Sequence, residues 1–572
     1  VTGANNNLTL DTTTTTGSAD NTFTGDINLG SGALSVTGDV VLGANVSVTA
    51  TPGSGVGIRF NDAVNADNAS SNDRTLTLNA GTSSSIQVTG TVGNSQALAG
   101  LTVTQSTGTN FSSTVDVSDS NSGTITLTDT TDGGNIVFNN NVTADTFTTA
   151  AQGYDIFLLG NATFANAVTF QNTGTLDLGN ATSDTLTFNG GLTENTTGNV
   201  TIDGAIVSSD DAISFGNILI GTNLSMTSAG GAISIGTISP AFGSQDITIT
   251  SSGGSANTVA VGAISDINTV AITSGTLTTL NGNITTDNNS GNSVTLVGTT
   301  TNGANITIDT NNTSNDGAIN IASFSSSNNN LALDSGTADI TLSGATFNLG
   351  SGSLTTTGDI NLAANVSITA TGGITINDKI DADSASSNDR TLTLNSGTGS
   401  AITFSDAIGS TEPLAGLTIT QSDGATFAST LDITDGSAGT FTVTDTEDGS
   451  DIIFNGAVTL ETVSFAQTGY DLVFNGSGNV FTNAVTFQNT GTLTLGNNTN
   501  DTFTFNGGLT ESTTGTVTLA STIDSSNDDI TFGAITLAAA TELDTNATDT
   551  NGDIIIGAVT GANNNLTLDT TT

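Results

Sequence analysis

Short strings in which apolar and polar residues alternate recur along the whole chain. The strings ISFGNI, ISIGTI and VAVGAI begin at Ile213, Ile233 and Val259. A second kind of string follows each of them, since LSMTS, ITITS and VAITS begin at positions 224, 247 and 270, a spacing of 23 residues. Alternation with a period of two is the pattern of a β-strand that buries one face. The pattern therefore predicts two types of short β-strand that return together at this spacing.

Strands of about five residues cannot bury a face alone, so they need to stack on like strands of the next period. Parallel stacking predicts an all-β chain, an elongated parallel β-solenoid with about 20–25 residues per coil. We expect one continuous solenoid over residues 1–572, wound as a right-handed β-helix like other parallel crossovers. An array of antiparallel sandwiches is the alternative, because Asn-Gly also marks β-hairpins. Sandwich domains run to about 100 residues, which fits the short period less well.

Phenylalanine followed by asparagine, and often by glycine, closes many of the predicted strands. Asn and Gly tolerate the left-handed backbone that a sharp corner needs. We expect the phenylalanine to stack on phenylalanine or valine of the next coil, and stacked asparagines to form amide ladders. These corners are Phe138-Asn139, Phe188-Asn189-Gly190, Phe454-Asn455-Gly456, Phe474-Asn475-Gly476 and Phe505-Asn506-Gly507.

Two longer repeats enclose the short period. Residues 17–224 correspond to residues 336–543, for example through NAVTFQNTGTL, which begins at Asn166 and again at Asn483. The segment 225–335 separates these two copies and is predicted to form intervening coils.

The sequence VTGANNNLTLDTTT also occurs twice, at residues 1–14 and at residues 559–572. A match of this length predicts a tandem unit of 558 residues, in which residues 559–572 start the next unit. The motif NNNLTLD at 5–11 has a relative, NNNLALD, at 328–334. We therefore expect the joint between units to fall within continuous solenoid rather than in a linker.

Charge excludes two classes of partner. The 572 residues include 52 acidic and four basic ones, for a net charge of −48. A surface this acidic repels phosphate backbones and anionic lipids, so we expect no nucleic acid partner. No apolar run is long enough to predict a membrane-spanning segment. The alternating apolar residues and the low proline content oppose disorder, although the charge alone would favour it.

The chain has no Cys and no His, so the common catalytic triads and dyads cannot form. We therefore expect that the protein is not an enzyme. A polysaccharide-cleaving β-helix that uses paired carboxylates, such as Asp210 and Asp211, is a further alternative.

Two acidic turns at equivalent places in the two copies are candidate calcium sites. They read TDTTDGGN at 128–135 and TDTEDGSD at 444–451. Calcium prefers clustered carboxylate and carbonyl oxygens, so the predicted ligands are Asp129, Asp132, Asp445 and Asp448. Solvated acidic turns without a specific site are the alternative, and the fold requires no cofactor.

The rare basic residues include one arginine at the same place in each copy of SSNDR. The simplest role is a local ion pair that fixes a loop: Arg74 with Asp73 or Asp67, and Arg390 with Asp389 or Asp383. These loops interrupt the coil rhythm, so they are also the candidate partner-binding loops.

The stretch from Val92 reads VGNSQALAGLTVTQSTGTNFSSTVDV in the first copy and IGSTEPLAGLTITQSDGATFASTLDI in the second. With the TFNGGLTE strands, it resembles the large bacterial β-strand-repeat surface proteins, which are similar to filamentous-haemagglutinin-like and autotransporter-like β-helical adhesins. The resemblance covers most of the chain as repeat texture. It implies a secreted or surface-anchored β-helical protein, and it carries over no catalytic residue.

These expectations describe a structural repeat unit of a giant extracellular filament or cell-surface stalk. The rigid acidic rod would join other units end to end and could bundle laterally with other rods. The alternative is an adhesin whose protruding loops bind a glycan or a partner cell. We expect any export signal and anchor to lie outside this sequence.

Overall fold

The computed structural model describes residues 1–3, 5–12, 20–67, 74–119, 122–254, 257–287, 291–312, 315–383, 390–435, 439–512, 515–545, 552–561 and 563–570. These residues form β-strands and turns with no helix among them, and the strands pair in parallel. They stack as a β-solenoid of about 23 turns with about 23 residues per coil, which confirms the predicted fold class. The right-handed winding stays a prediction.

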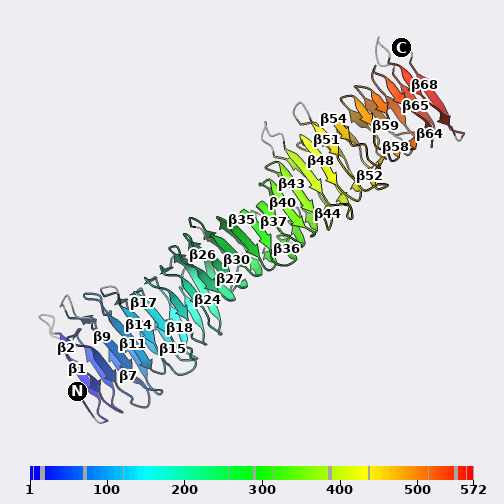
Figure 1. The fold of residues 1–572 in the computed structure, drawn as a ribbon. Helices are drawn as coiled ribbons and strands as arrows, with labels where there is room; N and C mark the ends of the chain where they lie inside the picture. The colour runs from blue at the N-terminus through cyan, green and yellow to red at the C-terminus, as the bar shows by residue number, and fades with distance from the viewer. Residues whose placement is uncertain are drawn as a thin grey trace. The chain divides into compact units, whose positions relative to one another are not determined.

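The chain divides into two compact units, Val1–Thr279 and Leu280–Thr572. Within each unit, strands of successive coils lie side by side, as Figure 1 shows. Each coil contains three strands, and each strand pairs with the strand at the same place in the next coil. The strands therefore form three columns, numbered here in the order in which the chain passes through β2, β3 and β4; β1, which pairs with β4, belongs to the third. Duplicated strands, such as β4 and β41, have the same column number in the two units.

The first column of unit 1 contains β2 (Asn21–Phe23), β5 (Val40–Leu42), β8 (Val64–Ala66), β13 (Val115–Val117), β16 (Val142–Ala144), β19 (Ala162–Phe164), β22 (Thr185–Phe188), β29 (Asp246–Ser251) and β32 (Thr269–Ser274). The second contains β3 (Ile27–Asn28), β6 (Val46–Thr49), β9 (Thr75–Asn79), β11 (Gly100–Gln105), β14 (Thr124–Leu127), β17 (Thr146–Thr149), β20 (Val168–Phe170), β23 (Leu192–Glu194), β25 (Ile213–Phe215), β27 (Ile233–Ile235), β30 (Thr258–Val261) and β33 (Leu277–Leu280). The third contains β1 (Leu8–Asp11), β4 (Leu34–Thr37), β7 (Val56–Phe60), β10 (Ser85–Val88), β12 (Thr109–Phe111), β15 (Asn135–Phe138), β18 (Asp155–Leu158), β21 (Leu176–Leu178), β28 (Ile238–Pro240) and β31 (Ile264–Ile267). The long strands β24 (Val200–Ser208) and β26 (Ile218–Ser228) run from the third column into the first.

The first column of unit 2 contains β39 (Ile340–Leu342), β42 (Ile360–Leu362), β45 (Ile380–Ala382), β50 (Leu431–Ile433), β53 (Val458–Leu460), β56 (Asn479–Phe481), β59 (Thr502–Phe505), β62 (Thr522–Asp524), β65 (Thr541–Asp544) and β68 (Leu566–Asp569). The second contains β40 (Thr346–Gly350), β43 (Val366–Ala370), β46 (Thr391–Asn395), β48 (Gly416–Gln421), β51 (Thr440–Val443), β54 (Thr462–Phe465), β57 (Val485–Phe487), β60 (Leu509–Glu511), β63 (Ile530–Phe532) and β66 (Ile554–Ile556). The third contains β34 (Ile284–Thr286), β36 (Ile306–Asp309), β38 (Leu331–Asp334), β41 (Leu354–Thr357), β44 (Ile374–Ile376), β47 (Ile402–Phe404), β49 (Ala425–Phe427), β52 (Asp451–Phe454), β55 (Asp471–Phe474), β58 (Leu493–Leu495), β61 (Val517–Leu519), β64 (Ile535–Leu537) and β67 (Val559–Thr560). The long strands β35 (Asn292–Asn302) and β37 (Ala318–Ser325) run from the first column into the second.

Three strands per coil is one more than the two strand types that the sequence pattern predicts. The string ISFGNI bends after Phe215, so Ile218 opens the next strand instead of ending the same one. Its equivalents Ile238 and Ile264 also begin third-column strands. The spacing of apolar residues does not reveal such a bend, because the strands before and after it both keep their apolar residues on the inside.

Stacked phenylalanines form much of the core of unit 2. The rings of Phe404, Phe427, Phe454 and Phe474 lie on four successive third-column strands, with neighbouring centroids 4.6 to 4.9 Å apart and nearly parallel planes. In unit 1, Phe111 and Phe138 stack in the same way at 4.8 Å. All of these rings are buried, and the expectation that phenylalanines before corners stack on the next coil is confirmed at these positions.

Asparagine amides also stack at the corners that follow these strands. The Asn475 amide nitrogen donates to the Asn455 amide oxygen at 3.0 Å, and both residues lie at corners. The corner residue Asn139 donates instead to Asn110 within strand β12, at 2.9 Å. The predicted amide ladders are therefore present where two such corners meet on neighbouring coils.

Carboxylates and amides also accept hydrogen bonds from the backbone of a neighbouring coil. The N–H of Thr75 donates to Asn45 Oδ1 at 3.1 Å, and the N–H of Gly123 donates to Asp145 Oδ2 at 2.8 Å. The same contact occurs from Ala33 to Asn7, Gly38 to Asp62, Thr175 to Asp155, Thr185 to Asn161, Thr237 to Asn217, Thr307 to Asn283, Gly358 to Asp378, Thr391 to Asn365, Thr492 to Asp471 and Asp553 to Asp529. Corner N–H groups outside the strand ladder would otherwise lack a protein acceptor, so these side chains hold the corners of adjacent coils in register.

We predict that Phe454→Ala lowers the free energy of unfolding by about 3–5 kcal/mol, because it opens a cavity between two stacked rings. The matched control is Thr426→Ala, whose side chain lies on the other face of the neighbouring strand β49; it should change the free energy by less than about 0.5 kcal/mol. Urea denaturation followed by circular dichroism checks both values. Equal effects of the two substitutions would contradict the stacked core.

Candidate functional sites

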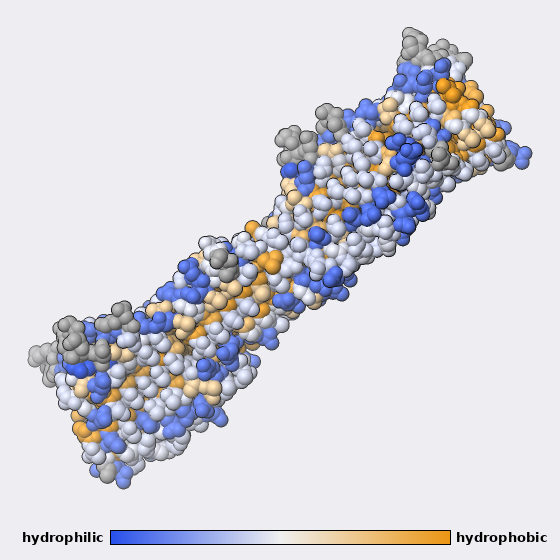
Figure 2. All heavy atoms as spheres, viewed as in Figure 1, coloured by the Kyte–Doolittle hydropathy of each residue, from blue (hydrophilic) through white to orange (hydrophobic). Residues whose placement is uncertain are grey.

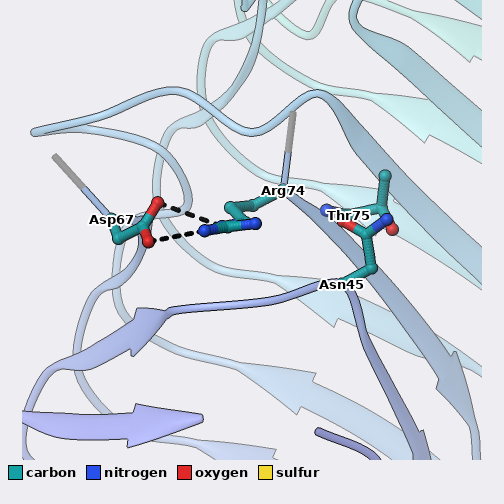
Figure 3. Close-up of polar contacts among 4 residues, drawn as sticks. All are labelled: Asn45, Asp67, Arg74 and Thr75. Atoms are coloured by element: carbon teal, nitrogen blue, oxygen red, sulfur yellow. Dashed lines mark hydrogen bonds and ion pairs between the residues drawn. The ribbon is translucent and has the colours of Figure 1, made fainter. Parts of the chain in front are cut away.

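An arginine–aspartate ion pair joins the two ends of the loop between β8 and β9. Arg74 Nε donates to Asp67 Oδ1 at 3.0 Å, and its Nη2 donates to Asp67 Oδ2 at 2.7 Å (Figure 3). Next to the pair, the N–H of Thr75 donates to Asn45 on the previous coil, so β9 begins at a fixed point. Two parallel hydrogen bonds between guanidinium and carboxylate give this pair a defined geometry. The hydrogen bond with Asp67 raises the pKa of Arg74.

The second copy reproduces this arrangement between β45 and β46. Arg390 donates to the two oxygens of Asp383 at 2.9 and 2.8 Å, and Thr391 donates to Asn365 at 3.1 Å. Of the two partners that the sequence allows for each arginine, the structure pairs Asp67 and Asp383. The other candidates, Asp73 and Asp389, lie outside the described residues. A role of these loops in partner binding stays a prediction.

The carboxylates of the acidic turns accept hydrogen bonds from donors of the protein itself. Asp129 Oδ2 accepts a hydrogen bond from Gln105 Nε2 at 3.1 Å, and Asp445 Oδ2 accepts one from Gln421 Nε2 at 3.4 Å. In both copies the donor lies on the preceding coil, so each contact links adjacent coils.

The other two predicted ligands, Asp132 and Asp448, are exposed at the same turns. The Asp448 carboxylate accepts a hydrogen bond from the N–H of Gly469 at 2.9 Å. Within the part of the chain that the structure describes, no group of three or more acidic side chains is arranged to hold a metal ion. The calcium site stays a prediction.

A shallow acidic hollow in unit 2 has no counterpart among the predicted sites. It has a volume of about 240 Å³, and its lining includes Asp339, Asp359, Asp381 and Glu412. Asp381 Oδ1 accepts hydrogen bonds from the N–H groups of Thr411 and Glu412 at 2.9 and 3.3 Å. Because the Asp381 carboxylate binds the backbone of a neighbouring coil, we interpret the hollow as a corner of the solenoid rather than a ligand site.

Two buried tyrosines stabilise equivalent corners, and the sequence reasoning missed them. The Tyr154 hydroxyl donates to the carbonyl of Leu127 at 3.0 Å and accepts from the N–H of Ala150 at 2.9 Å. The Tyr470 hydroxyl donates to the carbonyl of Ala466 at 3.1 Å. These are the only two tyrosines of the chain, and they occupy corresponding positions in the two copies. That coincidence was the available signal.

A buried asparagine lies beside each tyrosine. The Asn172 amide donates to the carbonyl of Thr175 at 3.0 Å and to that of Tyr154 at 3.3 Å. The Asn489 amide donates to Thr492 and Tyr470 in the same way, at 3.0 and 3.1 Å. The amide groups thus bind carbonyls at the corner, which is a structural role.

Carboxylates crowd together on neighbouring strands of the third column. Burial raises the pKa of Asp177, and the charges of Asp203 and Asp155 add to this effect. Burial also raises the pKa of Asp203, with a contribution from Asp184. Raised carboxyl pKa values can indicate catalysis, but here burial and the neighbouring carboxylates of the stacked coils account for both shifts.

No protein-family model, curated protein or solved structure matches this chain. The fold itself defines the class: the chain is a β-solenoid and fits a β-helical repeat protein. Among the described residues, no helix is long and apolar enough to cross a membrane.

We predict that Asp67→Asn lowers the thermal midpoint by at most about 2 °C, because a partly exposed ion pair contributes little. The difference should shrink as salt screens the pair. Asp383→Asn is the matched variant in the second copy and should behave alike. Calorimetry at low and high salt measures both, and a large decrease that is independent of salt would show that the pair does more than join the loop ends.

The tyrosines should resist alkaline titration. Burial raises the pKa of Tyr154 to about 12, and burial also raises the pKa of Tyr470. An unfolded tyrosine ionises near pH 10, so the neutral buried form favours the folded state fully below that pH. This advantage of the folded chain is lost as the pH rises from about 10 towards 12. Tyrosinate absorbance measured on Tyr154→Phe and Tyr470→Phe chains separates the two groups. Ionisation near pH 10 without loss of β-structure would contradict the buried environment.

Proposed function

We propose that the chain is a structural repeat unit of a giant extracellular filament or cell-surface stalk, with no catalytic role. The observation that carries this proposal is that polar side chains across the described coils bind the backbone of the neighbouring coil. Asp448 of an acidic turn, Tyr154 at its corner and Asp145 of a carboxylate corner are all used in this way. Such an arrangement supports coil-on-coil stacking.

The charge supports an extracellular polymer. Only three arginines and one lysine occur in 572 residues, so trypsin-like proteases have few cleavage positions. The net charge of −48 keeps neighbouring filaments apart unless cations screen it. Both properties suit a protein that persists outside the cell and can bundle laterally when cations are present.

A second candidate function is that of an adhesin of the β-helical type, which uses the loops at the two arginines. The observation that favours it is the double hydrogen bond that closes each loop at its base in both copies. The pair fixes the distance between the two ends of each loop, which suits a loop that recognises a glycan or a partner cell.

The filament proposal is tested with a two-unit chain, in which residues 15–572 are appended after Thr572 to continue the 558-residue period. About 23 coils per unit at a spacing of about 4.8 Å predict an added length on the order of 110 Å. Electron microscopy of the one-unit and two-unit chains measures this difference. Aligned specimens should also diffract with the ~4.8 Å strand spacing along the filament.

A two-unit particle whose longest dimension does not increase would contradict the filament. Glycan or cell attachment that disappears in an Asp67→Asn, Asp383→Asn double variant would instead favour the adhesin. Hydrolysis of a polysaccharide by the one-unit chain would contradict the absence of a catalytic role.

A further inference from the structure

The sequence VTGANNNLTLDTTT is present at two places in the structure, each time with a different neighbour. As β1, its LTLD segment pairs with the strand that follows it, β4. As β68, the same LTLD segment pairs with the strand that precedes it, β65. The two places together therefore show both neighbours that this strand would have inside a continuous array.

The registers of the two pairings agree. Leu10 is opposite Val36 in unit 1, and its identical counterpart Leu568 is opposite Leu543 in unit 2. Val36 and Leu543 are both fully buried. One leucine side chain can thus lie between them, with the alternation of inward and outward residues preserved on all three strands.

The last coil of unit 2 has an apolar surface that nothing in the described chain covers. Val559 and Leu568, which lie opposite the buried residues Ile535 and Leu543, are 45 % and 53 % exposed. Figure 2 shows hydrophobic residues gathered at this C-terminal end of the chain. At the first coil of unit 1, Val1, Leu8 and Leu10 line an open hollow together with Phe23 and Ile27. Both ends of the described solenoid are therefore apolar. At each end, the missing neighbour of the LTLD strand is the one that the strand has at the other end.

The two LTLD strands do not occupy the same column. β1 belongs to the third column with β4, and so does β38, whose NNNLALD motif pairs with β41, the duplicate of β4. In contrast, β68 lies on β65 in the first column. The first two residues of the repeated sequence shift in the same sense, since Thr2 bridges Asn28 of the second column and Thr560 pairs with Thr536 of the third.

We propose that the exposed edge of β67 and β68 is the docking surface for residues 27–37 of a second copy of this sequence, with Leu566 opposite Leu34 and Leu568 opposite Val36. Each 558-residue unit then begins one column, a third of a coil, further along the winding than the unit before it. This proposal rests on the tandem arrangement of the proposed function and adds its phase.

The shift has a consequence for what a filament displays. Equivalent features, such as the loop closed by Asp67 and Arg74, would lie over a different column in each of three successive units and return to the first column in the fourth. A filament built in this way distributes its loops over all three columns.

The two-unit chain tests this proposal, because the sequence contains no cysteine to interfere with engineered ones. Thr567→Cys combined with Ser35→Cys in the second unit should form a disulfide, since neighbouring strands are about 4.8 Å apart, within disulfide range. Thr560→Cys combined with the same Ser35→Cys should not form one. Thr560 lies in the third column, whereas the proposed shift places Ser35 of the second unit in the first column. The one-unit pair Thr9→Cys, Ser35→Cys is the matched control, because these residues are opposite each other in the structure.

Disulfide formation through Thr560 rather than Thr567 would overturn the column shift while leaving the filament intact, if the two-unit chain is still twice as long. If neither test pair forms a disulfide while the control pair does, the proposed docking surface is wrong. Leu568→Asp gives a second measurement, independent of disulfide geometry. It should lower the thermal midpoint several-fold more in the two-unit chain, where docking buries the side chain, than in the one-unit chain; equal decreases would contradict docking.

Discussion

Parallel pairing between successive coils is the interaction on which the rest of the structure depends. Most strands are only two to six residues long, too short to be stable alone, and they obtain their hydrogen bonds from the coils before and after them. Pairing in register places like side chains above one another, which produces the phenylalanine stack from Phe404 to Phe474 and the amide contact between Asn455 and Asn475. The corners need acceptors for N–H groups outside the ladder, and side chains such as Asn45 and Asp145 supply them.

The same constraint explains why an acidic chain can stack so regularly. Many carboxylates are placed next to a backbone N–H of the adjacent coil, where a negative acceptor is favourable. Stacking also buries carboxylates and brings them close to one another; burial raises the pKa values of Asp177 and Asp203, and the neighbouring carboxylates add to this effect. The acidic composition, read first as a clue to partners, is therefore also part of how coils are joined. This dual role favours a structural protein over a charged binding surface.

The repeat levels of the sequence are not equivalent in three dimensions. The internal duplication keeps its phase, since Asp67 with Arg74 and Asp383 with Arg390 close the same loop between first-column and second-column strands. The 14-residue repeat does not keep its phase, because LTLD lies in the third column as β1 and in the first as β68. A solenoid can continue through either joint, since any column accepts a short strand with one apolar face.

The sequence by itself determined the period, the all-β class and the inward residues, because alternation and spacing are local properties that stacking leaves intact. It also marked the corner phenylalanines and the arginine loops. Only the tertiary structure decided that a coil has three strands, that Arg74 pairs with Asp67, and that Tyr154 and Asn172 hold a buried corner. The bond from Tyr154 to Leu127 joins residues 27 positions apart on different coils. The contacts of Arg74 and Asn172 are local in the chain, but they form only where the stacked coils place the two ends of a loop or corner. No local pattern encodes that alignment, because bends such as the one after Phe215 change the column without changing the alternation.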